Sequence, residues 1–231
     1  MNGADASGWR PSFSAPASIA YAIAIFVAAT IPTLVTPLLV EDWREAFGWA
    51  EADLGMVAGL ELGGFALGAL SALYWQKRWS WRWVSAVALI VMAGANAVCA
   101  VIDTLPLMGA ARLLCGVGAG VVSGVHLAFV ANTRSAGRIV AIVTFCQLLA
   151  QAGVFLLADR LAAAAGVGGL YLLMAAVTGI CLSGLRLLPA GWPSGAVDAP
   201  ANEAPAPARH RLPFLLAFLS YGAFQLGLFT F

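Results

Sequence analysis

The stretch LMGAARLLCGVGAGVVSGVHLAFVA, residues 107–131, decides the fold class of this chain. A helix needs about 20 predominantly apolar residues to cross a bilayer core about 30 Å thick, and this stretch exceeds that length. Strands of membrane barrels have about ten residues of alternating polarity, and the stretch shows no such alternation. It therefore predicts a membrane-spanning α-helix.

Similar apolar stretches lie on both sides of it. The other predicted spans are 18–40, 53–74, 84–102, 139–158 and 167–188, and a seventh follows at 213–231. Of the 231 residues, 61% are hydrophobic and only 10% are charged, whereas a soluble domain has about 25% charged residues. This composition excludes a soluble enzyme, and we expect an all-α polytopic membrane protein.

The spans divide the chain into four predicted parts. Residues 1–17 form an N-terminal tail, and 18–188 form a six-helix transmembrane bundle. Residues 189–212 contain five prolines among small and polar residues, and such a segment buries too little apolar surface to fold, which is typical of a linker. We interpret 213–231 as the first helix of a second bundle that is truncated at Phe231.

Basic residues collect on one side of the predicted membrane. Nine lie on the side of the N-terminus and two on the other: the nine are Arg10, Lys77, Arg78, Arg82, Arg134, Arg138, Arg186, Arg209 and Arg211, and the two are Arg44 and Arg160. Cytoplasmic loops of membrane proteins are enriched in Lys and Arg. We therefore predict a multi-pass protein of the cell (plasma or inner) membrane, with its N-terminus and linker in the cytoplasm.

The charge balance and the cysteine spacing argue against nucleic acid and metal ions as partners. The 12 Lys and Arg residues stand against 11 Asp and Glu, which leaves no basic surface for nucleic acid. The four cysteines each lie inside an apolar stretch, without the close spacing of a zinc site. We expect no metal, no cofactor and no enzymatic activity, and we interpret the thiols as packing groups.

The centre of the fourth span carries a motif that resembles a known family. The run Arg112-Leu-Leu-Cys-Gly116-Val-Gly118-Ala-Gly120 is similar to the Arg-x-x-x-Gly-x-Gly pattern found in the fourth span of many members of the major facilitator superfamily. The predicted layout of six spans, a long cytoplasmic loop and a renewed span resembles the same family. The resemblance implies two six-helix bundles of 3+3 repeats that rock around a site at the membrane midplane.

The loop after the second span resembles the family's basic gating loop, with departures. The family pattern is Gly-x-x-x-Asp-Arg-x-Gly-Arg-Arg/Lys, and the best register places Leu73, Lys77, Arg78, Ser80 and Arg82 at its defined positions. Lys77 thus stands where the family has an acid. We retain Lys77, Arg78 and Arg82 as gating-loop candidates, without the charge pair that the missing acid would form.

Glu61 is the candidate for proton coupling. It lies about 12 Å from the outer end of the second span, near the midplane. An acid at this depth is costly and marks a functional site by default. Gly55, Gly59 and Gly63 form a stripe of small residues around it, which predicts close packing of another helix.

The fourth span carries a polar stripe. Arg112, Ser123 and His126 fall on one helical face with Ala119, and we predict that this face lines a solute cavity. Two alternatives remain: Arg112 could snorkel to the outer surface, and a structural hydrogen bond is the favoured role for His126. Arg112 also hints at an anionic solute.

The fifth and first spans add neutral polar groups. Gln147 and Gln151 lie at mid-depth, where two amides can bind a polar substrate or bridge helices. Thr33 lies between Pro32 and Pro37, and these prolines predict a bend or break in the outer half of the first span. We count Thr33 and both glutamines as candidate cavity-lining residues.

These observations predict a secondary active transporter that moves a small solute by alternating access with protons as the coupling ion. Its expected partners are that solute, protons, membrane lipid and the missing C-terminal half. One alternative is a non-transporting scaffold or receptor, which leaves the charged and amide groups at depth unexplained. The other is an intramembrane serine protease built on Ser123 and His126, but two residues three apart on one helix align poorly for catalysis.

Overall fold

A computed structural model describes residues 12–133 and 135–192. The first eleven residues of the predicted tail, Arg134, the linker from Pro193 onward and the predicted helix 213–231 lie outside the described residues. All regular secondary structure in the described part is helical, and this part contains no strand. Its elements are α1 (Pro16–Leu34), α2 (Thr36–Phe47), α3 (Glu51–Trp75), α4 (Trp81–Cys99), α5 (Leu105–Ala131), α6 (Ala136–Cys181) and the 3-10 helix η1 (Leu182–Leu187).

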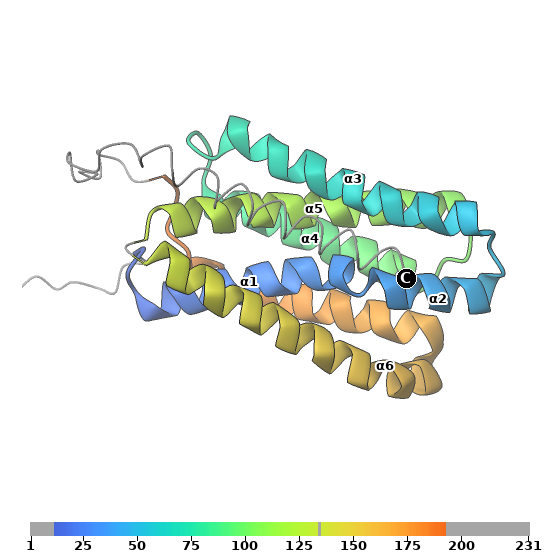
Figure 1. Ribbon diagram of the computed structural model, residues 1–231. Coiled ribbons are helices and arrows are strands. Elements are labelled where there is room, and N and C mark those ends of the chain that lie inside the picture. The colour runs from blue at the N-terminus through green and yellow to red at the C-terminus, as the bar shows by residue number, and fades with distance from the viewer. Residues whose placement is uncertain (1–11, 134, 193–231) are drawn as a thin grey trace, which may run out of the picture. The chain divides into compact units, whose positions relative to one another are not determined.

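Six helical segments of the described chain are long and apolar enough to cross a membrane, which confirms the all-α polytopic fold. They are Pro16–Leu34, Glu51–Trp75, Trp81–Cys99, Leu105–Ala131, Ala136–Ala158 and Gly168–Leu187. The helices run roughly side by side along one axis (Figure 1). The α5 helix is the most enclosed, because α1, α3 and α4 all pack against it.

The first span breaks where the prolines predicted. Val35 separates α1 from α2 with φ −98° and ψ 7°, because Pro37 has no N–H to continue the hydrogen-bond ladder. The chain then continues as α2 through residues that the sequence analysis placed in a connection. Gly48, in the left-handed conformation at φ 64°, ends α2.

The α6 helix is a hairpin of two spans. Gly166 interrupts it with φ 61° and ψ −163°, a conformation that glycine tolerates best. Figure 1 shows the first span running to this turn and the second running back beside it. The turn lies where the sequence predicts the connection between 139–158 and 167–188.

Glycines bring α3 and α5 into direct backbone contact. A Cβ built on Gly116 would lie 2.1 Å from the Glu61 carbonyl oxygen, and one on Gly120 would lie 2.0 Å from that of Phe65. From the other side, Gly64 and Gly68 meet the α5 backbone equally closely. The α3–α5 contact thus does not use the predicted stripe: Gly55, Gly59 and Gly63 have nothing within 4 Å of an added Cβ in the described chain.

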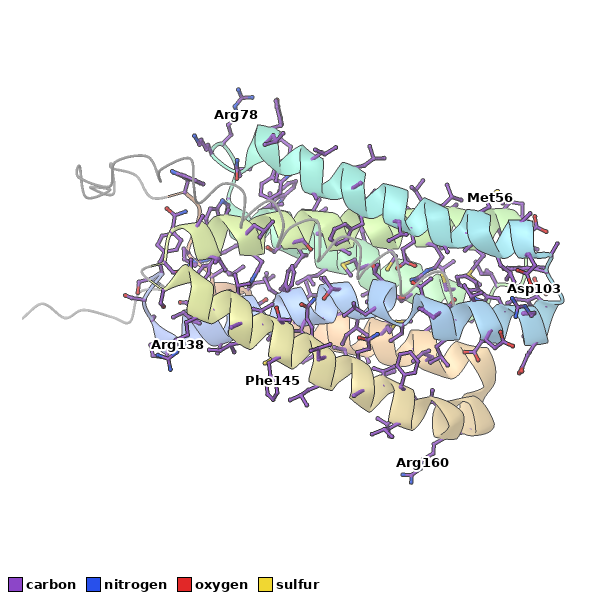
Figure 2. The ribbon with its side chains drawn as sticks, viewed as in Figure 1. Met56, Arg78, Asp103, Arg138, Phe145 and Arg160 are labelled. Atoms are coloured by element: carbon purple, nitrogen blue, oxygen red, sulfur yellow. The ribbon has the colours of Figure 1, made fainter. Side chains whose placement is uncertain are left out.

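The two ends of the bundle differ in charge. Arg78 and Arg138 lie at one end, and Asp103 and Arg160 lie at the other (Figure 2). Apart from Glu61, every acidic residue in the described ranges belongs to segments at the Asp103 end, whereas Lys77, Arg78 and Arg82 lie in or next to the α3–α4 loop at the opposite end. The basic and acidic residues that the sequence assigns to opposite sides of the membrane therefore lie at opposite ends of the bundle.

Candidate functional site

The centre of the site is an ion pair between α3 and α5. Arg112 Nη2 pairs with Glu61 Oε1, and Arg112 Nε donates to Glu61 Oε2 at 3.2 Å. Both side chains are enclosed, with exposed fractions of 0% for Arg112 and 1% for Glu61. Arg112 therefore does not snorkel, and the carboxylate is not isolated at mid-membrane.

Two further helices hold the guanidinium from its other sides. Arg112 Nη1 donates to Asn96 Oδ1 of α4 at 3.2 Å, and the Asn96 amide in turn donates to the Met92 carbonyl at 3.0 Å. The ring of Tyr171 from α6 lies 5.7 Å from the guanidinium carbon. Trp43 of α2 fixes this ring by donating from Nε1 to the Tyr171 hydroxyl at 2.6 Å.

The carboxylate reaches the break in the first span. Thr33 Oγ1 donates to Glu61 Oε1 at the long distance of 3.4 Å. The single Thr36 hydroxyl hydrogen is shared between Glu61 Oε2 at 3.4 Å and the Pro32 carbonyl at 3.2 Å. These threonines stand on the two sides of Val35, where α1 gives way to α2. Glu61 thus connects the charged centre to the irregular backbone at this joint.

Both predicted glutamines serve the same joint from α6. Gln151 Nε2 donates to the carbonyl of Leu34 at 2.9 Å, an oxygen that a continuous helix would pair with residue 38. The Leu38 N–H instead bonds to the Val35 carbonyl. Gln147 Nε2 donates to Thr30 Oγ1 at 2.8 Å. Of the two roles left open, the described contacts are those of a helix bridge.

Ser123 and His126 lie farther along α5, toward its C-terminal end and away from the ion pair. The Ser123 hydroxyl donates to Ala119 of its own helix at 2.8 Å. His126 Nδ1 donates to the Ala22 carbonyl of α1 at 3.0 Å, and its ring stacks on Phe26 with centroids 4.3 Å apart. Each side chain is at most 3% exposed. His126 makes the structural bond that its position favoured, and within the described chain Ser123 and His126 do not bond to each other.

The motif residues divide between packing and the loop. Gly116 and Gly120 allow the α3 contact described above, and Gly118 faces α4, where an added Cβ would lie 2.4 Å from Met92 Cγ. In the loop, the Lys77 ammonium lies 5.2 Å from the Trp192 ring and the Arg78 guanidinium 4.7 Å from the Tyr74 ring. Just after the loop, at the start of α4, Arg82 Nε donates to the Leu188 carbonyl at 2.7 Å.

Three site residues were missed from sequence. Asn96 is the one amide of its span, and a single amide in a span is more often a packing group, although its depth matches that of Arg112. Thr36 follows Thr33 by three residues beside Pro37, a spacing that could have indicated it. Tyr171 gave no signal, because a tyrosine in an apolar run is equally compatible with a lipid-facing position.

Chemically, the site is a closed network whose charges cancel. Moving one charge into a low-dielectric interior costs several kcal/mol unless a partner and hydrogen bonds compensate for it. Glu61 and Arg112 provide that compensation for each other here. In the described residues, no group of three or more His, Cys, Asp or Glu side chains could hold a metal ion.

One protein family matches nearly the whole chain. The sequence model of the Major Facilitator Superfamily matches residues 6–231. A search of curated proteins finds no match. The family match spans the six described helices and also the residues beyond Trp192.

Proposed function

The chain belongs to the Major Facilitator Superfamily, whose members carry small solutes across membranes, and we propose that it is a secondary active transporter that moves protons together with a small anionic solute. The observation that carries the proposal is the enclosed pair of Glu61 and Arg112. An ionisable pair at membrane depth that faces the bundle interior is the usual position of a proton relay or an ion site.

Charge balance explains how the two transported species would be coupled. As described, the site is neutral, because one carboxylate compensates one guanidinium. A proton on Glu61 alone would leave Arg112 charged and unpaired in the interior, which is strongly unfavourable. A solute carboxylate that pairs with Arg112 restores neutrality. Proton and anion therefore enter together, and neither is stable in the site alone.

The threonines provide a route from protonation to movement. Loss of the negative charge weakens the bonds that Thr33 and Thr36 donate to Glu61. These residues border a joint whose backbone is already irregular, so α1 and α2 can change their mutual angle without breaking a regular helix. We propose that this joint moves when the bundle changes between its inward-facing and outward-facing states.

The other candidate residues take supporting roles in this proposal. Gln147 and Gln151 stabilise the joint in one state, and they become solute ligands when α6 separates from α1. Ser123 and His126 maintain the packing of α1 on α5. We place the remaining solute contacts in a second bundle that begins at 213, and we place the N-terminus and the α3–α4 loop in the cytoplasm, in keeping with the basic bias of that end.

The test uses purified protein in vesicles that contain a trapped pH indicator. Small carboxylates, sulfonates and phosphates are added outside one at a time, with protein-free vesicles as the blank. A transported anion acidifies the lumen of wild-type vesicles. The Glu61→Gln variant should abolish this acidification and retain exchange of the radiolabelled anion without a gradient. Glu45→Gln, which changes an exposed carboxylate of α2, is the matched control.

Two results would contradict the proposal. Acidification that persists in Glu61→Gln would show that this carboxylate does not carry the proton. Transport that strictly prefers cations or neutral solutes would remove the role of Arg112, because the site would then hold an uncompensated charge.

A further inference from the structure

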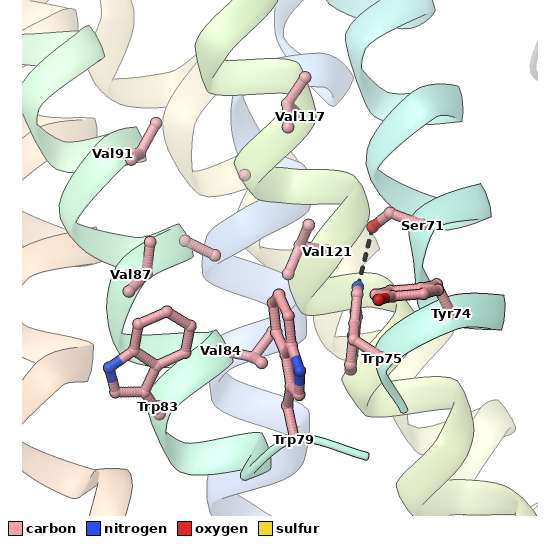
Figure 3. A pocket seen from close by; sticks show the side chains of 12 residues that line it. Ser71, Tyr74, Trp75, Trp79, Trp83, Val84, Val87, Val91, Val117 and Val121 are labelled. Carbon is pink, nitrogen blue, oxygen red and sulfur yellow. Dashed lines mark hydrogen bonds between the residues drawn. The ribbon is translucent and has the colours of Figure 1, made fainter. Parts of the chain in front are cut away.

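A groove with a row of aromatic rings at one end opens beside the α3–α4 loop and lies on the loop side of the ion pair along the helices. Val87 and Val91 of α4 form one wall, and Val117 and Val121 of α5 form the floor (Figure 3). Trp79 and Trp83 stand at the loop end of the same cavity, which has a volume of about 360 Å³. We call this cavity the aromatic groove.

The aromatic groove offers almost nothing to a polar ligand. Two lining side chains carry a hydroxyl, Ser71 and Tyr74. The Ser71 hydroxyl accepts a hydrogen bond from Trp75 Nε1 at 2.9 Å and donates to the Gly68 carbonyl at 2.6 Å. Both hydrogen-bonding functions of the Ser71 hydroxyl are therefore used inside the protein. Apart from the Tyr74 phenol, the other lining side chains are aliphatic groups and indoles, so the ligand portion that occupies the groove must be apolar.

The dimensions and direction of the groove match one acyl chain. Eight residues of α4 separate Trp83 from Val91, which is about 12 Å along the helix at 1.5 Å per residue. One leaflet of the hydrocarbon core is about 15 Å deep. Trp83 and Val87 are 59% and 41% exposed, so the groove opens sideways, toward the lipid that surrounds a membrane-spanning bundle.

A row of rings closes the loop end of the groove at the depth of the lipid headgroups. Tyr74 and Trp79 meet edge to face with centroids 6.1 Å apart, and Trp79 and Trp83 do so at 5.9 Å. Tryptophan and tyrosine prefer the headgroup layer, where one end of the ring system is apolar and the other is hydrated. The row thus marks the boundary between an acyl chain and its headgroup.

The loop next to this row is basic, and the described part of the chain places no compensating acid beside it. Arg78 lies over Tyr74 and Lys77 lies beside Trp192, and neither forms an ion pair within the described ranges, where the ion pairs involve Arg44 and Arg112. Apart from Glu61, the acidic residues of that part lie toward the opposite end. Two cations therefore stand at the headgroup level with no carboxylate of residues 12–133 or 135–192 near them.

We propose that the aromatic groove is a binding site for one anionic phospholipid, with an acyl chain along Val87 and Val91 and the phosphate on Lys77 and Arg78. The juxtaposition of an apolar groove and unpaired cations fits a ligand that is apolar at one end and anionic at the other. A zwitterionic lipid fits less well, because its ammonium group would find no acidic partner among the described residues of this end. The proposal does not depend on proton coupling or on the transported solute.

The experiment is native mass spectrometry of the delipidated protein in detergent, titrated with dioleoyl phosphatidylglycerol or dioleoyl phosphatidylcholine. Phosphatidylglycerol should bind more tightly. Each basic residue near a membrane surface strengthens the binding of anionic lipid about fivefold, so Lys77→Gln combined with Arg78→Gln should weaken phosphatidylglycerol about 25-fold and leave phosphatidylcholine unchanged. Arg138→Gln, another exposed cation at the same end of the bundle, is the matched control.

Filling the groove tests the acyl-chain half of the proposal. Val91→Phe should weaken both lipids, and Val140→Phe, on the exposed surface of α6, should weaken neither. Val87→Phe is a second filling variant at a more exposed position, in case Val91→Phe does not fold. Thermal unfolding of each variant verifies its integrity.

Three outcomes would overturn the proposal. Equal losses in Arg138→Gln and the double charge variant would show a general charge effect and no site. A loss confined to the charge variants would mean that the headgroup binds without the groove. Competition by soluble glycerol phosphate at the same concentration as the lipid would indicate a free-anion site. These experiments measure lipid binding and unfolding and do not measure transport. A failure of the proposed transport function would therefore show only in the vesicle assay.

Discussion

Removing one charge of the Glu61–Arg112 pair should destabilise the protein more than removing both. Glu61→Gln preserves the shape of the side chain but leaves a guanidinium in a site where it is fully enclosed. Its remaining partners are the Asn96 oxygen at 3.2 Å and the Tyr171 ring. Breaking a buried pair in this way costs about 3–5 kcal/mol.

The complementary variants set the scale of the effect. Arg112→Met should cost less than Glu61→Gln, because a carboxylate left alone can bind a proton whereas a guanidinium cannot release one. The double variant places neutral groups at both positions, and replacing a buried pair with neutral groups of similar volume is often close to neutral in stability. It should therefore recover more than half of the loss seen in Glu61→Gln.

Buried thiols provide the assay. Cys99 and Cys115 are buried in the folded protein, so a thiol-reactive dye reports unfolding in a background where Cys146 and Cys181 are replaced by alanine. A loss of 3–5 kcal/mol corresponds to a fall in the unfolding midpoint of about 10 °C for a domain of this size. Glu45→Gln, an exposed carboxylate, should change the midpoint by less than about 2 °C. If the losses of the two single variants simply add in the double variant, the two charges do not stabilise each other and the reasoning fails.

Two further predictions concern packing and orientation. Gly120→Ala should abolish or severely weaken folding, because its Cβ would lie 2.0 Å from a backbone oxygen of α3. Gly59→Ala has free space around the new Cβ and should stabilise α3 by up to about 1 kcal/mol. Comparable effects of the two substitutions in the same dye assay would contradict the observed helix register. In a cysteine-free background, Ser12→Cys and Ser80→Cys should not react with an impermeant maleimide in intact cells, whereas Glu45→Cys should react. Labelling of Ser80→Cys from outside would reverse the proposed topology.

The sequence by itself determined the features that depend on composition and on covalent structure. The positions of the six spans follow from the length of apolar runs, which water and lipid separate without reference to neighbouring helices. The break at Val35 follows from Pro37, because its missing N–H removes one bond of the helical ladder. Pro32 lacks the same bond and stays inside α1, so the prolines predicted a bend or break in this half of the span but not its residue. The accumulation of basic residues at one end is likewise a property of the loops themselves.

Only the tertiary structure decided which face of each helix meets which neighbour. Successive residues on a helix point about 100° apart, so the step from Gly63 to Gly64 separates an open surface from the contact with α5. Hydropathy does not resolve this rotation in a helix that is apolar on all sides. The same uncertainty hid the ion pair: Glu61 and Arg112 are 51 residues apart, and each is an isolated charge until the α3–α5 packing sets their rotation. Asn96 and Tyr171 then join because three helices converge on one guanidinium, a geometry that no single span encodes.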